Sequence, residues 1–450
     1  MDKKKGELSF KVKTGYGSGD LGGNLFFTVV AFWLMNYLTD EVGLSASLAG
    51  AALMIGKIWD AVTDPAVGYL SDRTRTRLGR RRPWMLAGSV PLGLSFFFLF
   101  TNPRLEGQST LFIWAALAYM AVCTFYTFVN IPYNAMTPEL TKDFDERTVL
   151  NGYRMMFAVV GTLIGAGTAL PIINAAAGRT AGYMIMGGIY GAIMTVTALV
   201  PVITVKEPVH GKFEKGENIF RSYLSALKTR PFLLILLPWV FNIIGITIVT
   251  ATLIYYFKYV LMSEGLMTVA MIVLLVTSMI FIPLAVKLSE RIGKKQTYIA
   301  GMSLFALSVL IVFFLGHLLD IKFIFVMMFF SGMGFSTHYV LPWAIIPDTV
   351  EYDYSRTGIR REGVFYSLWT FSIKLGQALA GLLVGIILDA FGYLPDVPQT
   401  ASAMLGIRLL IGPFTAVFFI VANTILWFYP IDRDAYEKIR DDIRKMEEGQ

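Results

Sequence analysis

The chain has 450 residues, of which 55% are hydrophobic and 16% are charged, and its mean hydropathy is +0.59. Soluble domains carry about 25% charged residues, so this composition excludes an ordinary water-soluble domain and favours a membrane protein. The formal net charge is +7, but the basic residues lie in short segments between apolar runs, as the positive-inside rule describes. We therefore expect membrane lipid around the chain and no nucleic-acid partner.

Apolar runs of about 20 residues, enough to cross a bilayer, predict about twelve membrane helices. In chain order they lie near 20–40, 45–70, 84–102, 109–136, 148–175, 181–204, 231–261, 267–289, 296–316, 321–345, 362–390 and 405–429. The fold class is thus an all-α membrane protein in two six-helix halves. The expected domains are a first half at 1–205, a cytoplasmic linker at 206–230, a second half at 231–430 and a cytoplasmic tail at 431–450.

The distribution of Lys and Arg predicts the orientation of the chain. Basic segments such as RTRTRLGRRR and ERIGKK, the linker and both termini fall on one set of alternate loops, and the other set holds few basic residues. Cytoplasmic loops carry the excess of Lys and Arg. We expect a multi-pass protein of the cell membrane with both termini in the cytoplasm.

Two pairs of segments indicate that the halves are related. The sequence IPYNAMTPE at 131–139 resembles LPWAIIPD at 341–348, and GRR at 79–81 resembles GKK at 293–295. Transporters commonly contain such internal duplications. One chain therefore has the parts of a complete carrier, and we expect it to function as a monomer.

Three charged residues inside the second span indicate an ion site. Lys57, Asp60 and Asp64 share one helix face, because their spacings are three and four residues. A charged side chain inside a bilayer costs about 2.5–3.5 kcal/mol, so such groups usually face a water-filled path. Carboxylate oxygens suit Na⁺, Li⁺ or H⁺, and Lys57 can balance the charge when no cation is bound. The alternative is a structural ion pair between helices.

Two further basic residues are candidates for the substrate site. Lys374 lies inside the eleventh span, too far from either end for easy snorkelling, and is the expected partner of the paired carboxylates. Arg154 lies early in the fifth span. Its planar fork can bind a carboxylate or a pair of hydroxyls, although it can also serve as an interfacial anchor.

Neutral polar and aromatic residues complete the candidate site. Asn24, Asn130 and Asn134 can hydrogen-bond a polyol or a neighbouring helix. Thr127 lies one turn before Asn130 on the same helix. Trp343 can stack on a sugar face or serve only in packing.

Charged residues near the cytoplasmic ends of the spans form a candidate gate, in which basic groups meet acidic groups and helix C-termini. These residues are Asp72, Arg73, Arg80, Glu139, Asp348 and Glu351.

No motif of an enzyme is found. Residues 17–22 match G-x-G-x-x-G, but a membrane span follows and no strand precedes them, so we interpret them as a flexible start of the first span. The three histidines show no metal-ligand spacing. We predict a protein that is not an enzyme and needs no cofactor besides a coupling ion.

The chain resembles the glycoside–pentoside–hexuronide:cation symporters, a melibiose-permease-like family of the major facilitator superfamily. The resemblance covers nearly the whole chain and is strongest at YGSGDLGGN (16–24), YLTDEVGLS (37–45), KIWDAVTDPAVGYLSDRTRTRLGRRRPW (57–84), NIPYNAM (130–136) and LPWAIIPDTVEY (341–352).

The resemblance implies roles for individual residues. Asp60 and Asp64 take the positions of the cation-site carboxylates, Na⁺ being one ion they would hold, with Thr127 and Asn130 nearby. Lys57 takes the position of a basic residue that balances charge, and Lys374 that of a lysine between the sugar and cation sites. The implied substrate-binding residues are Asn24, Asn130, Asn134, Arg154, Trp343 and Lys374.

The chain also departs from melibiose permease, which has aspartates at the positions of Asn24 and Asn130 and a tryptophan at that of Asn134. A galactoside is therefore not the implied substrate. We expect uptake of a glycoside, pentoside or hexuronide driven by Na⁺ or H⁺. The alternative is a cation-coupled lysophospholipid symporter, because that branch of the superfamily resembles the chain at the second-span motif, at Tyr153-Arg154-Met155 and at LPW.

Overall fold

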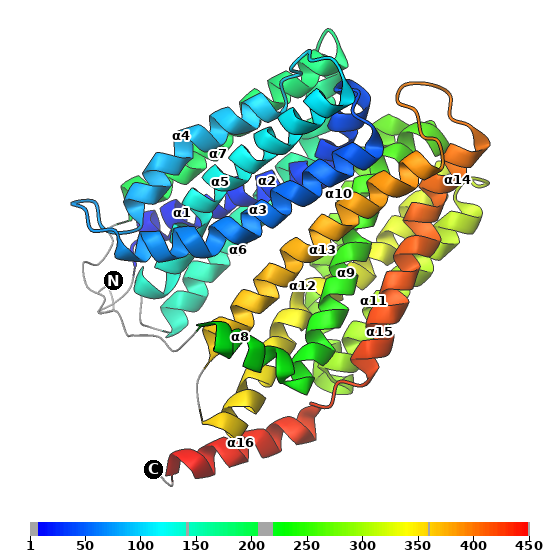
Figure 1. The fold of residues 1–450 in the computed structure, drawn as a ribbon. Coiled ribbons are helices and arrows are strands. Elements are labelled where there is room, and N and C mark those ends of the chain that lie inside the picture. The colour runs from blue at the N-terminus through cyan, green and yellow to red at the C-terminus, as the bar shows by residue number, and fades with distance from the viewer. Residues whose placement is uncertain (1–7, 141–143, 206–218, 359–360, 449–450) are drawn as a thin grey trace. The chain divides into compact units, whose positions relative to one another are not determined.

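The computed structural model describes residues 8–140, 144–205, 219–358 and 361–448. Within these ranges the chain is almost wholly helical and contains no β-strand (Figure 1). The side chains of Asp72 and Glu139 are outside the described set, so their expected gate role has no structural account.

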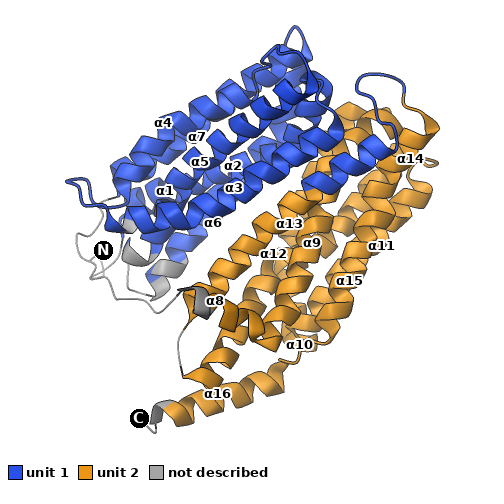
Figure 2. Ribbon diagram, in the orientation of Figure 1, with its two compact units in different colours: residues 1–212, 381–398 blue, residues 213–380, 399–450 orange. Residues whose placement is uncertain are grey.

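The chain divides into two compact units (Figure 2). The first comprises Met1–Lys212 with Gly381–Pro398, and the second comprises Phe213–Ala380 with Gln399–Gln450. The stretch Gly381–Pro398 groups with the first unit, although it belongs to the second half in sequence order.

The first unit contains α1 (Phe10–Gly17), α2 (Gly19–Val29), η1 (Val30–Leu34), η2 (Tyr37–Glu41), α3 (Ala46–Arg73), α4 (Arg82–Leu99), α5 (Gln108–Leu140), α6 (Phe144–Ala175) and α7 (Arg179–Thr204). The second contains α8 (Ile219–Lys228), α9 (Arg230–Tyr255), η3 (Tyr256–Val260), η4 (Glu264–Leu266), α10 (Met267–Ile292), α11 (Lys294–Leu315), α12 (Ile321–Thr357), α14 (Ala401–Leu409), η5 (Leu410–Phe414), α15 (Thr415–Trp427) and α16 (Arg433–Glu448). Helix α13 (Glu362–Ala390) contributes to both units.

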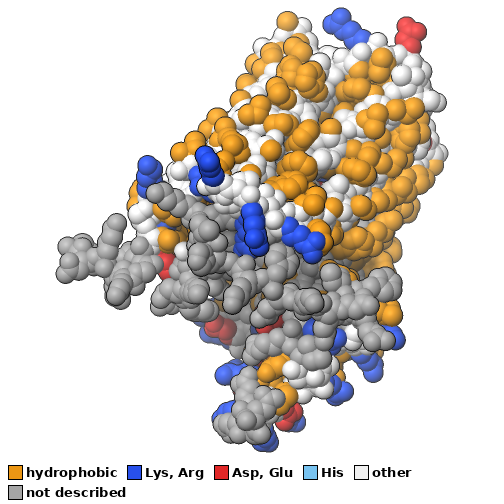
Figure 3. Space-filling model, turned by 60° about the vertical axis from the view of Figure 1, so that its left-hand side comes forward, with side chains coloured by type: hydrophobic (Ala, Val, Ile, Leu, Met, Phe, Trp, Pro, Cys, Tyr) orange, Lys and Arg blue, Asp and Glu red, His pale blue; other side chains and the backbone are white. Residues whose placement is uncertain are grey.

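Helical segments cover all the expected spans. In the described part of the chain, nine helices are long and apolar enough to cross a membrane. Helix α3 is not among the nine, which agrees with the charged side chains inside it. Figure 3 shows hydrophobic side chains over most of the upper part of the visible face and most of the visible Lys and Arg below them.

Local sequence explains where the longest helix begins and ends. Asp320 precedes α12, and its side chain accepts the backbone N–H of Lys322, which satisfies one of the free donors of the first turn. Gly358 follows the helix with a φ of 66°, a left-handed conformation that glycine adopts without a steric penalty.

Two glycines set the helix spacing in the first unit. A Cβ at Gly56 of α3 would lie 2.1 Å from the ring of Tyr119 on α5. A Cβ at Gly161 of α6 would lie 2.2 Å from the carbonyl oxygen of Leu21 on α2. Real contacts are never this short, so only glycine permits these helix pairs to approach so closely. The first pair places Asp60 beside Thr127, and the second places Arg154 beside α2.

Candidate functional site

The two carboxylates of α3 meet one hydroxyl of α5. Thr127 Oγ1 lies 3.1 Å from Asp60 Oδ1 and 3.0 Å from Asp64 Oδ1. Thr127 is fully buried, Asp60 is 2% exposed and Asp64 is half-buried. A hydroxyl has a single hydrogen, so Thr127 donates to one of the two carboxylates at a time. The structure thus brings together three of the expected cation-site residues.

Lys57 is buried one turn before this pair. It is 5% exposed, and its ammonium lies 5.1 Å from the centre of the Phe27 ring, a cation–π contact. Thr63, which the sequence analysis did not identify, donates to the backbone oxygen of Asp60 at 3.2 Å and lies 3.5 Å from Thr127 Oγ1. Its neutral hydroxyl on a charged helix face gave no distinctive signal.

Asn130 was expected both near the carboxylates and among the substrate-binding residues. Its side-chain oxygen accepts a hydrogen bond from Asn134 Nδ2 at 2.8 Å, and it makes no side-chain hydrogen bond to Asp60 or Asp64 in the described structure. Asn130 thus bonds to Asn134, another of the expected substrate-binding residues.

Arg154 of α6 contacts residues of α2 and α5. Its Nε donates to Asp20 Oδ2 at 2.5 Å, its Nη2 donates to Asn134 Oδ1 at 2.6 Å, and its Nη1 donates to Thr137 at 2.8 Å. The side chains of Arg154 and Asp20 are only 12% and 11% exposed. The interfacial-anchor interpretation of Arg154 is thus wrong for this structure, because the guanidinium is held inside the unit.

Asp20 is the residue that sequence reasoning missed. We expected residues 17–22 to be a flexible start of the first span, but Gly17 ends α1, Ser18 joins the two helices and the others lie in α2. A Cβ at Gly19 would lie 2.6 Å from the Tyr133 ring. These glycines serve close packing. A carboxylate within the first apolar run was the available signal, because such groups require a partner.

Asn24 lies one turn from Asp20 on α2. Its Nδ2 donates to the backbone oxygen of Asp20 at 2.9 Å, and its backbone oxygen accepts from Thr28 at 2.8 Å. The side chain is half-buried. The amide oxygen of Asn24 makes no hydrogen bond in the described structure and is available as an acceptor.

Trp343, in the second unit, lies at the edge of a stacked aromatic cluster. Its ring is 6.3 Å from that of Trp239 and 6.1 Å from that of Trp369, edge to face in both cases. Trp239 and Trp369 stack at 4.6 Å and are buried, whereas Trp343 is 43% exposed. Trp343 therefore has a supported ring with accessible surface, as a sugar-stacking residue requires.

Hydrogen-bonded side chains of the second unit pack against this aromatic cluster. Asn242 Nδ2 donates to Tyr298 at 2.8 Å, and the Tyr298 hydroxyl lies 3.2 Å from His338 Nδ1. The His338 ring stacks on Trp239 at 4.7 Å. Lys374, on α13, is half-buried in the second unit.

The expected gate residues have separate environments. Asp348 binds Lys294, whose Nζ lies 2.8 and 2.6 Å from its two carboxylate oxygens. Arg73 lies exposed over the Tyr69 ring, 3.7 Å from its centre, and Arg80 is half-buried.

Glu351 is half-buried near Tyr436, and burial together with this carboxylate raises the pKa of the Tyr436 phenol to about 12.

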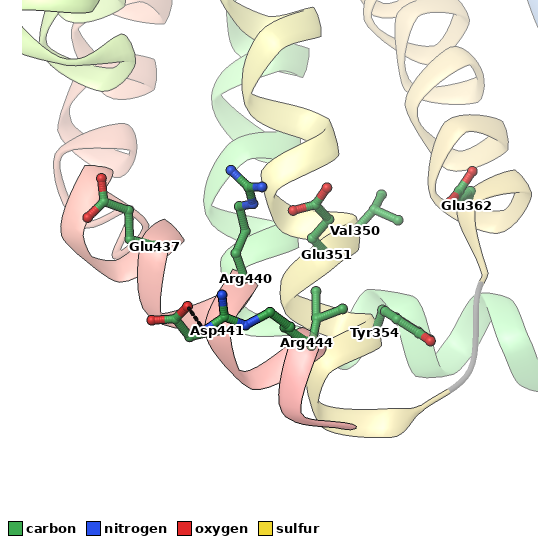
Figure 4. A pocket seen from close by; sticks show the side chains of 9 residues that line it. Val350, Glu351, Tyr354, Glu362, Glu437, Arg440, Asp441 and Arg444 are labelled. Atoms are coloured by element: carbon green, nitrogen blue, oxygen red, sulfur yellow. Dashed lines mark ion pairs between the residues drawn. The ribbon is translucent and has the colours of Figure 1, made fainter. Parts of the chain in front are cut away.

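Glu351 also faces a charged cavity between α12 and α16 (Figure 4). The cavity has a volume of about 660 Å³. Its lining residues are Val350, Glu351, Tyr354, Glu362, Glu437, Arg440, Asp441, Ile443 and Arg444. With six charged side chains, this cavity suits water and ions better than a sugar ring, which needs an aromatic or apolar face.

The long apolar helices define a multi-pass membrane protein, and the fold is that of the major facilitator superfamily. A bacterial homologue of the human lysosomal transporter Spinster has the same fold, with a TM-score of 0.67 and 14% identity over 96% of this chain and 97% of that one.

Residues 15–433 match the family described as MFS/sugar transport protein, and the chain belongs to this family, that of the glycoside–pentoside–hexuronide:cation symporters. It is 31% identical to the putative sulfoquinovose importer of Escherichia coli, over 98% of this chain and 94% of the relative. It is 30% identical to the glucuronide carrier protein homolog of Escherichia coli, over 97% and 96%. The protein is therefore a transporter of a small molecule and not an enzyme.

Proposed function

We propose that this protein is a symporter that couples the entry of Na⁺, Li⁺ or H⁺ to the uptake of a sugar by alternating access. The observation that carries the proposal is the Thr127 hydroxyl between the carboxylates of Asp60 and Asp64. Family membership supports a transporter, and this arrangement supports its coupling to a cation.

The chemistry of the carboxylate pair favours a small hard cation. Two carboxylates beside one hydroxyl repel each other, and burial strengthens the repulsion because the local dielectric is low. A proton or an alkali cation at Asp60 and Asp64 relieves it. Lys57, on the same helix, supplies positive charge when the cation leaves. These three residues form our proposed coupling site.

The proposed sugar-binding residues are of two kinds. The first unit offers amide and guanidinium groups from Asn24, Asn130, Asn134 and Arg154, which can hydrogen-bond hydroxyl or carboxylate oxygens. The second unit offers the half-exposed ring of Trp343 and the ammonium of Lys374. The names of the relatives, which mention sulfoquinovose, a glucuronide and a glycoside, support a sugar as the cargo.

The distribution of Lys and Arg along the sequence supports a proposal for the cellular setting. We propose a location in the cell membrane with both termini in the cytoplasm, since the Lys- and Arg-rich segments share the side of the termini. We also propose that a monomer is functional and that no cofactor is needed besides the coupling ion.

The decisive experiment is uptake into proteoliposomes. A panel of labelled glycosides, pentosides and hexuronides is supplied under separate Na⁺, Li⁺ and H⁺ gradients. At least one sugar should accumulate under at least one gradient, and Asp60→Asn or Asp64→Asn should abolish accumulation while the protein remains folded. Full accumulation by both variants would refute the proposed coupling site.

The same vesicles test the lysolipid alternative. Uptake of a labelled lysophosphatidylcholine that no sugar of the panel inhibits, together with no sugar uptake, would replace the sugar proposal. The charged cavity between α12 and α16 suits water and ions and does not favour a lipid.

A further inference from the structure

The ion pair between Asp20 and Arg154 is a buried feature that the proposed coupling site does not use. The two carboxylate oxygens of Asp20 accept from Arg154 Nε at 2.5 Å and from Nη2 at 3.2 Å. Tyr133 also donates to Asp20 Oδ2, at 2.7 Å. Counted with its backbone, Asp20 is 9% exposed. This bidentate geometry is the strongest form of carboxylate–guanidinium pairing.

Nearly all the N–H donors of Arg154 are used in hydrogen bonds within the unit. A guanidinium has five N–H donors and no acceptor. Asp20 takes two of them, Asn134 takes a second Nη2 hydrogen and Thr137 takes one Nη1 hydrogen. The ring of Tyr133 lies 4.9 Å from the guanidinium carbon and covers it. Arg154 therefore has one defined orientation and little capacity to change it.

This orientation determines how the neighbouring amides point. Because Arg154 can only donate, the side chain of Asn134 must turn its oxygen toward Nη2. Its Nδ2 then faces Asn130 and donates to Asn130 Oδ1 at 2.8 Å. The Nδ2 group of Asn130, at the end of this row, is left as a donor. Asn134 is exposed and Asn130 half-buried, so the end of the row is accessible.

Helix packing holds the pair in place. The backbone of α6 at Gly161 touches that of α2 at Leu21, the residue after Asp20. A Cβ at Gly17 would lie 3.1 Å from the backbone of Tyr153, the residue before Arg154. Helix α6 is thus held close to α2 on one side of the ion pair, at Gly161, and close to the end of α1 on the other, at Gly17.

The charge of Asp20 is required to keep Arg154 inside the unit. Removing one partner of a buried ion pair leaves an uncompensated charge, which is strongly unfavourable. Without the carboxylate, the long arginine side chain would move toward water, and the amide of Asn134 would no longer be held.

We infer that Asp20 is a positioning residue for sugar binding: through Arg154 it sets the hydrogen-bond direction of Asn134 and Asn130, so that the row ends in an amide donor for a sugar oxygen. This inference rests on the proposed function. Asp20 acts through Arg154 and need not touch the sugar itself.

The test compares Asp20→Asn with a matched control, Glu146→Gln. Glu146 pairs with Lys13 at 3.0 Å in the same unit, and the side chains of that pair are 10% and 11% exposed, close to the values for Asp20 and Arg154. Each variant is reconstituted, and uptake of nitrophenyl β-glucoside and nitrophenyl β-glucuronide is measured over a range of concentrations. Thermal stabilisation by Na⁺, Li⁺ or H⁺ without sugar is measured on the same samples.

Asp20→Asn should raise the KM for the transported probe at least tenfold, with kcat within threefold of wild type and cation stabilisation unchanged. Glu146→Gln should leave KM unchanged. The double variant Asp20→Asn/Arg154→Gln should be no worse than either single variant, because the two residues act as a unit. Asn134→Ala interrupts the row without disturbing the buried pair, so it should raise KM even if Asp20→Asn fails to fold.

Three results are distinguishable. If wild type transports a probe and neither Asp20→Asn nor Asn134→Ala changes its KM, the inference is overturned while the proposed function stands. Additive effects in the double variant would also overturn it. If wild type transports neither probe nor any sugar of the wider panel, the proposed function itself has failed.

Discussion

The carboxylate of Asp389 accepts the backbone N–H of Ala46 at 3.0 Å, although the two residues are 343 positions apart. The same carboxylate accepts the N–H of Ser47 at 2.8 Å. These are free donors of the first turn of α3, and Ser45 at the N-cap makes no side-chain bond to them. A distant part of the sequence thus caps the helix that carries Asp60 and Asp64.

This relationship predicts an effect on stability. Asp389→Ala should lower the free energy of unfolding by about 1 kcal/mol, because two N–H groups lose a charged acceptor. Ser45→Ala is the control and should have almost no effect. The measurement is thermal unfolding of the purified protein in detergent. Equal effects of the two substitutions would contradict the prediction.

The hydroxyl between the carboxylates predicts a difference between two replacements of Thr127. Thr127→Ser keeps the hydroxyl and should retain coupled uptake. Thr127→Val has nearly the same shape without the donor. It should raise the half-saturating cation concentration about tenfold, because a tenfold change corresponds to about 1.4 kcal/mol, the value of one hydrogen bond to a charged group. Uptake as a function of cation concentration distinguishes the two. Identical cation dependence would exclude a role for the hydroxyl.

The contact of Gly161 with Leu21 predicts that a single methyl group disturbs the first unit. Gly161→Ala should destabilise the protein by about 1–3 kcal/mol, because its Cβ would meet backbone that cannot easily move. Gly152 lies on the same helix with no neighbour within 4 Å of a Cβ, so Gly152→Ala should be neutral or stabilising by up to about 1 kcal/mol. Thermal unfolding of both variants checks the pair. A stable Gly161→Ala protein would argue against the close approach of α2 and α6.

The ion pair of Lys294 and Asp348 predicts an asymmetric response. The Lys294 side chain is 40% exposed and that of Asp348 only 11%. Lys294→Met should therefore cost more stability than Asp348→Asn, because water can solvate the lone ammonium but not the lone carboxylate. The double variant should cost less than the sum of the single variants. A larger loss for Asp348→Asn would show that the carboxylate has another source of compensation.

Much of the fold could be predicted from the sequence. Each expected span coincides with helical structure, because burial in lipid requires long apolar helices and these are visible in composition alone. The close spacing of Lys57, Asp60 and Asp64 also indicated their common face, since helix geometry is local. The meeting of Asp60 and Asp64 with Thr127 depended on a resemblance to known symporters, because nothing within either helix specifies its neighbour.

Other features could not be predicted in this way. The pairing of Asp20 with Arg154 joins residues 134 positions apart, and it depends on the contact of two backbones at Gly161 and Leu21. Asn130 was expected at both the cation site and the substrate site, and the sequence could not show that its amide oxygen accepts from Asn134, because side-chain direction depends on which donors surround it. The partners of these side chains depend on packing between helices, so no periodic pattern in the sequence indicates them.

The sequence by itself determined that this is a helical membrane protein with charged residues inside its spans, because hydropathy and helical periodicity are properties of short segments. Only the tertiary structure decided that Asp20 is the partner of Arg154, whereas the resemblance to known symporters already implied that Thr127 lies near Asp60 and Asp64. The physical reason is that a buried charge must find compensation, and which group provides it depends on the helices that glycine contacts allow to approach.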